Sequence, residues 1–208
     1  MTDARTEIMR RIRDAYPDAP TSVAVPRDYA RSTSDEDVVG LFAERVADYR
    51  ATVHRVPPAD LARAVAAALE RGGIRRLIVP TGLPGDWLAA ASRDIARLTD
   101  DRPLSNVDLD AADGVITGCA IAIAVTGSIV LDAGPGQGRR ALSLLPDYHL
   151  CVIPASRIVG DVPEALERLD PRRPLTWISG PSATSDIELE RVEGVHGPRN
   201  LEVVIVGR

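Results

Sequence analysis

Two periods of hydrophobic and polar residues run along this chain, one typical of helices and one typical of strands. Near the start, residues 3–15 carry apolar side chains on one helical stripe, which predicts an amphipathic helix. The stripe consists of Ile8, Met9, Ile12 and Ala15. Residues 16–33 contain three prolines and no period, so an extended connection is expected there.

A second helix is expected next, because Ser34 with Asp37 three residues later is typical of a capping box. Its apolar positions run from Val38 to Tyr49 at helical spacing. From residue 51 onward, short strand-like runs alternate with longer helical runs. This alternation indicates βα units and a largely parallel sheet with flanking helices, which is the Rossmann-like form of the α/β class.

The expected strands cover residues 51–56, 75–80, a short run near 104, 149–154, 175–179 and 201–206. The expected helices cover residues 57–71, 86–97, 108–112, 140–145 and 162–169. Residues 114–132 are small and β-branched and are interrupted by Gly118 and Gly127, which predicts two buried strands joined at a tight turn. We therefore expect a helix and an extended arm over residues 1–34 and a single α/β domain over residues 35–208.

The composition is that of a folded globular protein, with 45% hydrophobic and 26% charged residues. A net charge of −5 provides no basic footprint for nucleic acid, and one Phe, two Trp and four Tyr are too few for a base-stacking surface. No stretch has the length of a signal peptide core or of a membrane span. A cytoplasmic protein without a membrane span or a nucleic-acid partner is therefore expected.

The two cysteines, Cys119 and Cys151, are too few for a disulfide framework and form no CxxC pair. An iron–sulfur cluster usually takes four thiolates, so this chain should hold none by itself. Both cysteines lie in apolar, strand-like runs and are expected to be buried structural thiols. The three histidines lack metal-ligand spacing, and no bound metal is predicted.

Three segments that follow predicted strands could carry chemistry. The first is DAGPGQGRR at residues 132–140, in which Gly134, Gly136 and Gly138 could turn backbone N–H groups toward an anion. Arg139 and Arg140 would add guanidinium donors that suit a carboxylate or a phosphate. A flexible turn with two solvated arginines is the alternative, and the segment has neither P-loop nor dinucleotide-binding spacing.

The second segment is SGPSATSDIE at residues 179–188. Ser179 and Gly180 begin it, and Ser182, Thr184 and Ser185 could cap a helix whose N-terminus would bind an anion. A plain helix cap without a ligand is the alternative. Asp186 and Glu188 follow as candidates for an acid or a base, although carboxylates near a helix start can also serve only the helix dipole.

The third segment is EGVHGPR at residues 193–199, where His196 lies between glycines and is not expected to be helical. An imidazole in a loop could exchange a proton or hydrogen-bond a ligand. A structural histidine that binds a nearby carbonyl is the alternative, because a lone histidine identifies no mechanism.

Taken together, residues 117–154, 178–199 and 201–208 resemble the LUD domain of the lactate utilization protein C family. The resemblance is close over about residues 114–208, and residues 35–113 have the order of elements expected of the same domain. It implies a fold of the type shared by ribose-5-phosphate isomerase, glucosamine-6-phosphate deaminase and CoA transferases. It also implies a role in oxidising L-lactate to pyruvate for use as a carbon source, beside partner proteins that carry iron–sulfur clusters.

Two positions depart from the expected family pattern. Ala120 stands where an aspartate would follow Cys119, and Val125 stands where a glutamate would follow Ala124. The loss of two carboxylates favours ligand or partner binding over independent catalysis, and whether the chain is an enzyme stays open.

The leading hypothesis is an accessory subunit of an iron–sulfur L-lactate oxidation system. In it Arg139 and Arg140 would pair with a small carboxylate, the serine and threonine hydroxyls would hold it, and His196 would orient it. An independent isomerase-like or CoA-transferase-like enzyme acting on a sugar phosphate or a thioester is the alternative, and it rests on fold analogy. A regulator or scaffold without a ligand is the third possibility.

Overall fold

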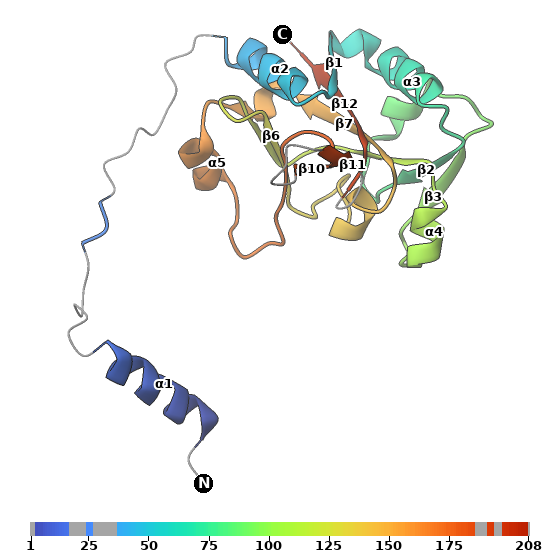
Figure 1. Ribbon diagram of the computed structural model, residues 1–208. Coiled ribbons are helices and arrows are strands. Elements are labelled where there is room, and N and C mark those ends of the chain that lie inside the picture. The colour runs from blue at the N-terminus through green and yellow to red at the C-terminus, as the bar shows by residue number, and fades with distance from the viewer. Residues whose placement is uncertain (1–2, 17–23, 27–36, 186–190, 194–196, 208) are drawn as a thin grey trace.

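Six parallel strands form the central sheet of this protein (Figure 1). The computed structural model describes residues 3–16, 24–26, 37–185, 191–193 and 197–207. From edge to edge the strands are β1 (Thr52–Val56), β12 (Asn200–Val206), β7 (Tyr148–Pro154), β4 (Gly114–Thr117), β2 (Arg76–Val79) and β3 (Ala96–Thr99). The last strand of the chain thus lies between the first and the seventh, where it aligns Glu202 with Thr52 and Leu150.

The central strands read as nearly continuous apolar runs because both faces of the sheet are covered. Helix α3 (Leu61–Arg71), entered through the 3-10 turn η1 (Pro58–Asp60), packs on the face formed by Leu150, Val152 and Val204. Helix α2 (Val38–Asp48) packs on the opposite face, where Phe42 and Val46 meet Cys151, Ile153, Val203 and Ile205.

A second, four-stranded sheet covers the face on which α2 lies. Its order is β8 (Ile158–Val159), β5 (Ile121–Ile123), β6 (Ser128–Leu131) and β9 (Thr176–Ile178). Ala122 and Ile129 face the core shared with the central sheet, whereas Ile121, Ile123 and Val130 pack against α5 (Val162–Arg168). A short antiparallel pair, β10 (Ala183–Ser185) and β11 (Arg191–Glu193), follows β9.

Most of the predicted elements are present. The N-terminal helix α1 (Ala4–Ala15) has its apolar stripe exposed, and no residue of it is buried. Helix α2 begins one residue after Asp37, whose carboxylate accepts a hydrogen bond from the Gly40 amide at 2.8 Å. Asp37 is therefore the cap of this helix, and Ser34 lies outside the described residues. Within the described part of the chain, no helix is long and apolar enough to cross a membrane.

Three predictions of secondary structure were wrong. Residues 86–97 form one 3-10 turn, η2 (Gly85–Leu88), and then contribute to β3, because pairing with the edge of β2 overrides their local helix propensity. Leu104 is not in a strand, since Ser105 and Asp108 form a capping box that starts α4 (Asn106–Asp110). Residues 114–132 form three strands, because Gly118 separates β4 from the β5–β6 hairpin.

Two short 3-10 turns complete the fold. The expected helix at residues 140–145 is the turn η3 (Arg140–Ser143), and η4 (Ala155–Arg157) joins β7 to β8. The tight turn predicted at Gly127 is present between β5 and β6, and Gly127 has a φ of +59°. A Cβ atom at this position would lie 2.9 Å from the backbone of Arg45 in α2, so glycine is required here.

Candidate functional site

The structure divides the predicted site residues between two places. The glycine-rich segment lies against the loops that follow β2 and β4, where Gly118 donates to the Gly136 carbonyl at 2.8 Å and Gly136 donates to the Thr81 carbonyl at 2.9 Å. Arg140, Ser179, Gly180 and Ser182 instead surround a separate cavity. The two groups therefore do not form one anion site.

The glycine N–H groups that were predicted to bind an anion have acceptors within the protein. The Gly134 amide donates to the Asp132 carboxylate at 3.0 Å, the Gly136 amide to Thr81, and the Gly138 amide to the Gly134 carbonyl at 3.4 Å. All three donors are thus used within the protein. The glycines are needed for the conformation of this loop, because Gly136 and Gly138 have positive φ angles of 72° and 70°, which other residues rarely adopt.

Arg139 has a structural partner. Its guanidinium donates to both carboxylate oxygens of Asp100, at 2.8 and 3.1 Å, and to the Leu104 carbonyl at 2.7 Å. Burial alone would raise the pKa of Asp100, but the hydrogen bonds from Arg139 and from the Leu104 amide lower it overall. Arg139 therefore fixes the loop after β3, and its donors are not directed at the cavity that Arg140 lines.

The predicted helix cap after Ser182 was also wrong, because residues 183–185 form strand β10 and pair with β11. Thr184 and Ser185 thus lie in a strand and offer no helix N-terminus to an anion. The other candidates, Asp186, Glu188 and His196, lie outside the described residues.

The residues that do come together line a cavity of about 270 Å³, which we call the Ser179 cavity. The lining residues are Arg140, Ser143, Leu144, His149, Thr176, Trp177, Ile178, Ser179, Gly180, Pro181, Ser182, Gly197, Pro198 and Leu201. Apolar walls with a few polar groups are typical of small-molecule sites, whose volumes begin at about 300 Å³. The Ser179 cavity therefore suits a ligand of a few heavy atoms.

Hydrogen bonds from the β5–β6 hairpin position Ser179 at the wall of this cavity. Ser128 and Ser179 share a hydrogen bond between their Oγ atoms at 2.7 Å, and Thr126 donates to Ser128 at 2.9 Å. Gly180 follows with a φ of +88°, and a Cβ atom there would lie 2.5 Å from the Tyr49 side chain. The Ser182 amide then donates to the Pro198 carbonyl at 2.7 Å, which closes the rim.

A buried histidine forms part of the wall. His149 lies on β7 and is 1% exposed, and its Nε2 is 2.7 Å from Thr117 Oγ1. Thr117 in turn contacts Cys151 Sγ at 3.8 Å, and the Cys151 thiol donates to the Gly118 carbonyl at 3.7 Å. Burial lowers the pKa of His149 to about 4, so the imidazole is neutral at pH 7.

Arg140 supplies positive charge to the cavity. Its side chain is exposed and, unlike that of Arg139, is not paired with a carboxylate of the described residues. A guanidinium without a carboxylate partner among the described residues, in a cavity also lined by serines and a neutral imidazole, can bind a small carboxylate through charge-assisted hydrogen bonds.

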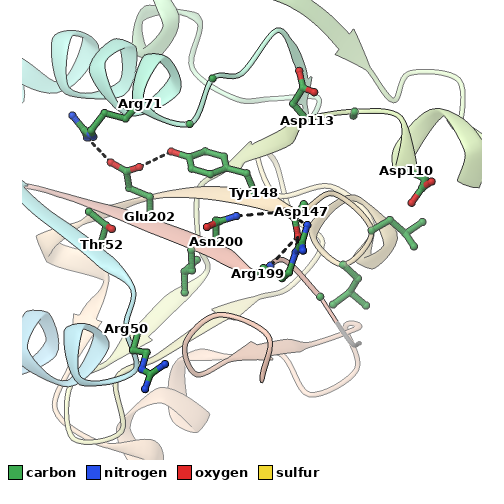
Figure 2. Close-up of a pocket in the computed structure, with 17 residues that line it drawn as sticks. Arg50, Thr52, Arg71, Asp110, Asp113, Asp147, Tyr148, Arg199, Asn200 and Glu202 are labelled. Carbon is green, nitrogen blue, oxygen red and sulfur yellow. Dashed lines mark hydrogen bonds and ion pairs between the residues drawn. The ribbon is translucent and has the colours of Figure 1, made fainter. Parts of the chain in front are cut away.

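A larger cavity of about 1230 Å³ opens at the amino ends of β1, β7 and β12 (Figure 2). Its centre is Glu202, a carboxylate with 7% side-chain exposure. Glu202 accepts hydrogen bonds from Tyr148 and His54, each at 2.7 Å, and from Arg71. Burial alone would raise the pKa of Glu202, but these three donors lower it overall.

Two further carboxylates that line this larger cavity also have protein partners. Asp113 accepts from the amides of Arg75 and Arg76 at 2.8 and 2.7 Å, and Asp147 pairs with Arg199 at 2.6 Å (Figure 2). We therefore interpret the larger cavity as a structural ion-pair cluster and the Ser179 cavity as the candidate site.

The two positions that lack a carboxylate lie away from the Ser179 cavity. Ala120 lines a different hollow with Asp132 and Arg157, and Val125 lies in the exposed turn between β5 and β6. Their apolar side chains therefore leave the candidate site unchanged. In the described residues, no group of three or more His, Cys, Asp or Glu side chains is arranged to hold a metal ion.

Sequence reasoning missed His149, Thr176 and the contact between His149 and Thr117. The available signal was a polar side chain inside an apolar strand run, since buried polar residues are more informative than exposed ones. Cys119 and Cys151 are buried, as predicted, and burial raises the pKa of both thiols, that of Cys151 to about 12.

Comparison with known proteins gives consistent results. The chain is 48% identical to lactate utilization protein C of Deinococcus radiodurans over 97% of this chain and 93% of that protein. It is 37% identical to lactate utilization protein C of Shouchella clausii over 46% of this chain and 44% of that protein. The crystal structure of a DUF162 family protein from Deinococcus radiodurans superimposes with a TM-score of 0.70 at 43% identity, covering 82% of this chain and 97% of that one. The LUD domain matches residues 39–206, and the chain therefore belongs to the LUD domain family.

Proposed function

We propose that this protein is an accessory subunit of an L-lactate oxidation system and binds a small carboxylate in the Ser179 cavity. The observation that carries the proposal is the meeting of Arg140 with Ser179 and Ser182 around a cavity of about 270 Å³. The name and near full-length similarity of the Deinococcus radiodurans relative support lactate utilization as the context.

The redox step is assigned to partner proteins. Cys119 and Cys151 are both buried, and burial keeps their thiols protonated at neutral pH. Two protonated, buried thiols offer no ligand set for an iron–sulfur cluster. Electrons from lactate would therefore pass to clusters held by the partners, while this chain binds the carboxylate.

Replacing Arg140 with alanine should weaken binding of L-lactate by at least tenfold, because a charge-assisted hydrogen bond contributes about 1.5–3 kcal/mol. Isothermal titration of the purified chain with L-lactate measures this change. Arg172→Ala is the matched control, since Arg172 is exposed, pairs with Asp170 and does not line the cavity. Equal affinities of the wild type and Arg140→Ala would contradict the carboxylate site.

The subunit proposal is tested by purifying the tagged full-length chain from lactate-grown cells. Iron-containing proteins should co-elute and reduce a dye in the presence of L-lactate. An iron-free chain that instead is stabilised by sugar phosphates or CoA esters in a thermal-shift screen would support the independent-enzyme alternative.

A further inference from the structure

His149 has one ring nitrogen, Nε2, bound to the protein, and the residue lines the Ser179 cavity. Nε2 lies 2.7 Å from Thr117 Oγ1, and the histidine lines the cavity although it is only 1% exposed. No hydrogen bond from a described residue reaches Nδ1, and yet no fully buried nitrogen or oxygen of a described side chain lacks a partner. Nδ1 is therefore not fully buried, and since His149 lines the Ser179 cavity we take this nitrogen to be accessible to a ligand or a water molecule there.

The hydrogen bonds behind His149 favour one position for the imidazole proton. The Gly118 carbonyl can only accept, so the Cys151 thiol donates its single proton to it at 3.7 Å. Burial raises the pKa of Cys151 to about 12, so this proton is present at neutral pH. The sulfur is then left as an acceptor for the Thr117 hydroxyl, which approaches it to 3.8 Å.

Thr117 has only one hydroxyl proton, and its oxygen accepts when that proton points to Cys151. The group 2.7 Å away on the other side must then donate, which places the imidazole proton on Nε2 of His149. Each proton in the series thus has an acceptor, and hydrogen bonds in such a series strengthen one another. Nδ1 remains as a lone-pair acceptor at the cavity.

We infer that the unprotonated Nδ1 of His149 makes the Ser179 cavity selective for a 2-hydroxy acid over the corresponding 2-oxo acid. The inference rests on the proposed carboxylate site. A 2-hydroxy acid presents an O–H donor next to its carboxylate, so Arg140 can hold the carboxylate while Nδ1 accepts from the hydroxyl. A 2-oxo acid offers only acceptors beside its carboxylate, so its carbonyl would face the lone pair of Nδ1.

A site built to bind a hydroxyl group rejects an analogue that lacks it, because a buried polar group is then left unpaired. An unmade hydrogen bond at a buried acceptor typically changes affinity by tenfold or more. The full-length chain should therefore bind L-lactate about tenfold more tightly than pyruvate, and propionate should resemble pyruvate.

The experiment is isothermal titration of the full-length wild type and of His149→Gln with L-lactate, pyruvate and propionate. Glutamine keeps a terminal N–H for Thr117 but has no acceptor next to Cγ, so the preference for lactate should fall to about twofold or less. Equal affinities of the wild type for lactate and pyruvate would overturn the selectivity and leave carboxylate binding intact. Failure of all three acids to bind would overturn both.

A second measurement does not depend on a variant that folds at position 149. Nitrogen-15 NMR of histidine-labelled wild type reports the tautomer of each imidazole, and His54→Gln and His196→Gln assign the His149 signals by elimination. A protonated Nε2 with a bare Nδ1 at pH 7 is the expected result. A protonated Nδ1 would overturn the inference, whatever the ligand affinities.

Discussion

Replacing Glu202 with alanine should lower the free energy of unfolding by about 3 kcal/mol, one of the two largest effects that we expect. Glu202 is a nearly buried carboxylate that joins β12 to β7, β1 and α3 through Tyr148, His54 and Arg71. Without it the Tyr148 hydroxyl, in a side chain that is 7% exposed, loses its short partner at 2.7 Å. Urea denaturation analysed by linear extrapolation measures the change.

The expected loss of about 3 kcal/mol lies at the low end of the range for breaking a buried ion pair, because the Arg71 cation is partly hydrated. The Arg71 side chain is 51% exposed, so water can solvate its charge after Glu202 is removed. Asp110→Ala is the matched control, since Asp110 lines the same cavity at an exposed position and should change stability by less than about 0.5 kcal/mol. A loss below about 1 kcal/mol in Glu202→Ala would show that this network contributes little to the fold.

The strands that lie at the centre of the sheet could be predicted from sequence, and one edge strand could not. Residues 149–154 and 201–206 are apolar runs because both of their faces are covered. Such a run is typical of a central strand of a parallel sheet. Strand β3 at residues 96–99 is mostly exposed and has no such run. Its strand conformation comes from pairing with β2, a contact between segments that local sequence does not encode.

The candidate site, too, could be predicted only in part from the sequence. Ser179, Ser182 and Arg140 were predicted because polar residues after a strand end commonly line sites. For the glycine segment, residue spacing shows that N–H groups are available but not that Thr81 and Asp132 accept from two of them. His149 was missed because its polar partner, Thr117, lies 32 residues away in the chain.

Stability should also fall by about 3 kcal/mol as the pH is lowered from 6.5 to 4, because His149 is buried in its neutral form. Burial lowers the pKa of His149 from 6.5 to about 4. Above pH 6.5 the His149 imidazole is mostly neutral in both the folded and the unfolded chain, so its contribution to the free energy of unfolding is fully present. Below it the unfolded chain binds a proton first, so stability declines until the folded imidazole is protonated near pH 4.

Denaturation of the wild type and of His149→Gln at half-unit steps from pH 7.5 to 4 tests this prediction. Asp100, Asp147 and Glu202, whose pKa values are lowered in the folded chain, lose their stabilising contribution mainly as the pH falls below about 4.5. The His149→Gln profile should therefore be flatter than that of the wild type in this range. Two parallel profiles would show that His149 is accessible to protons in the folded state, and the Ser179 cavity would then contain an imidazolium at mildly acidic pH.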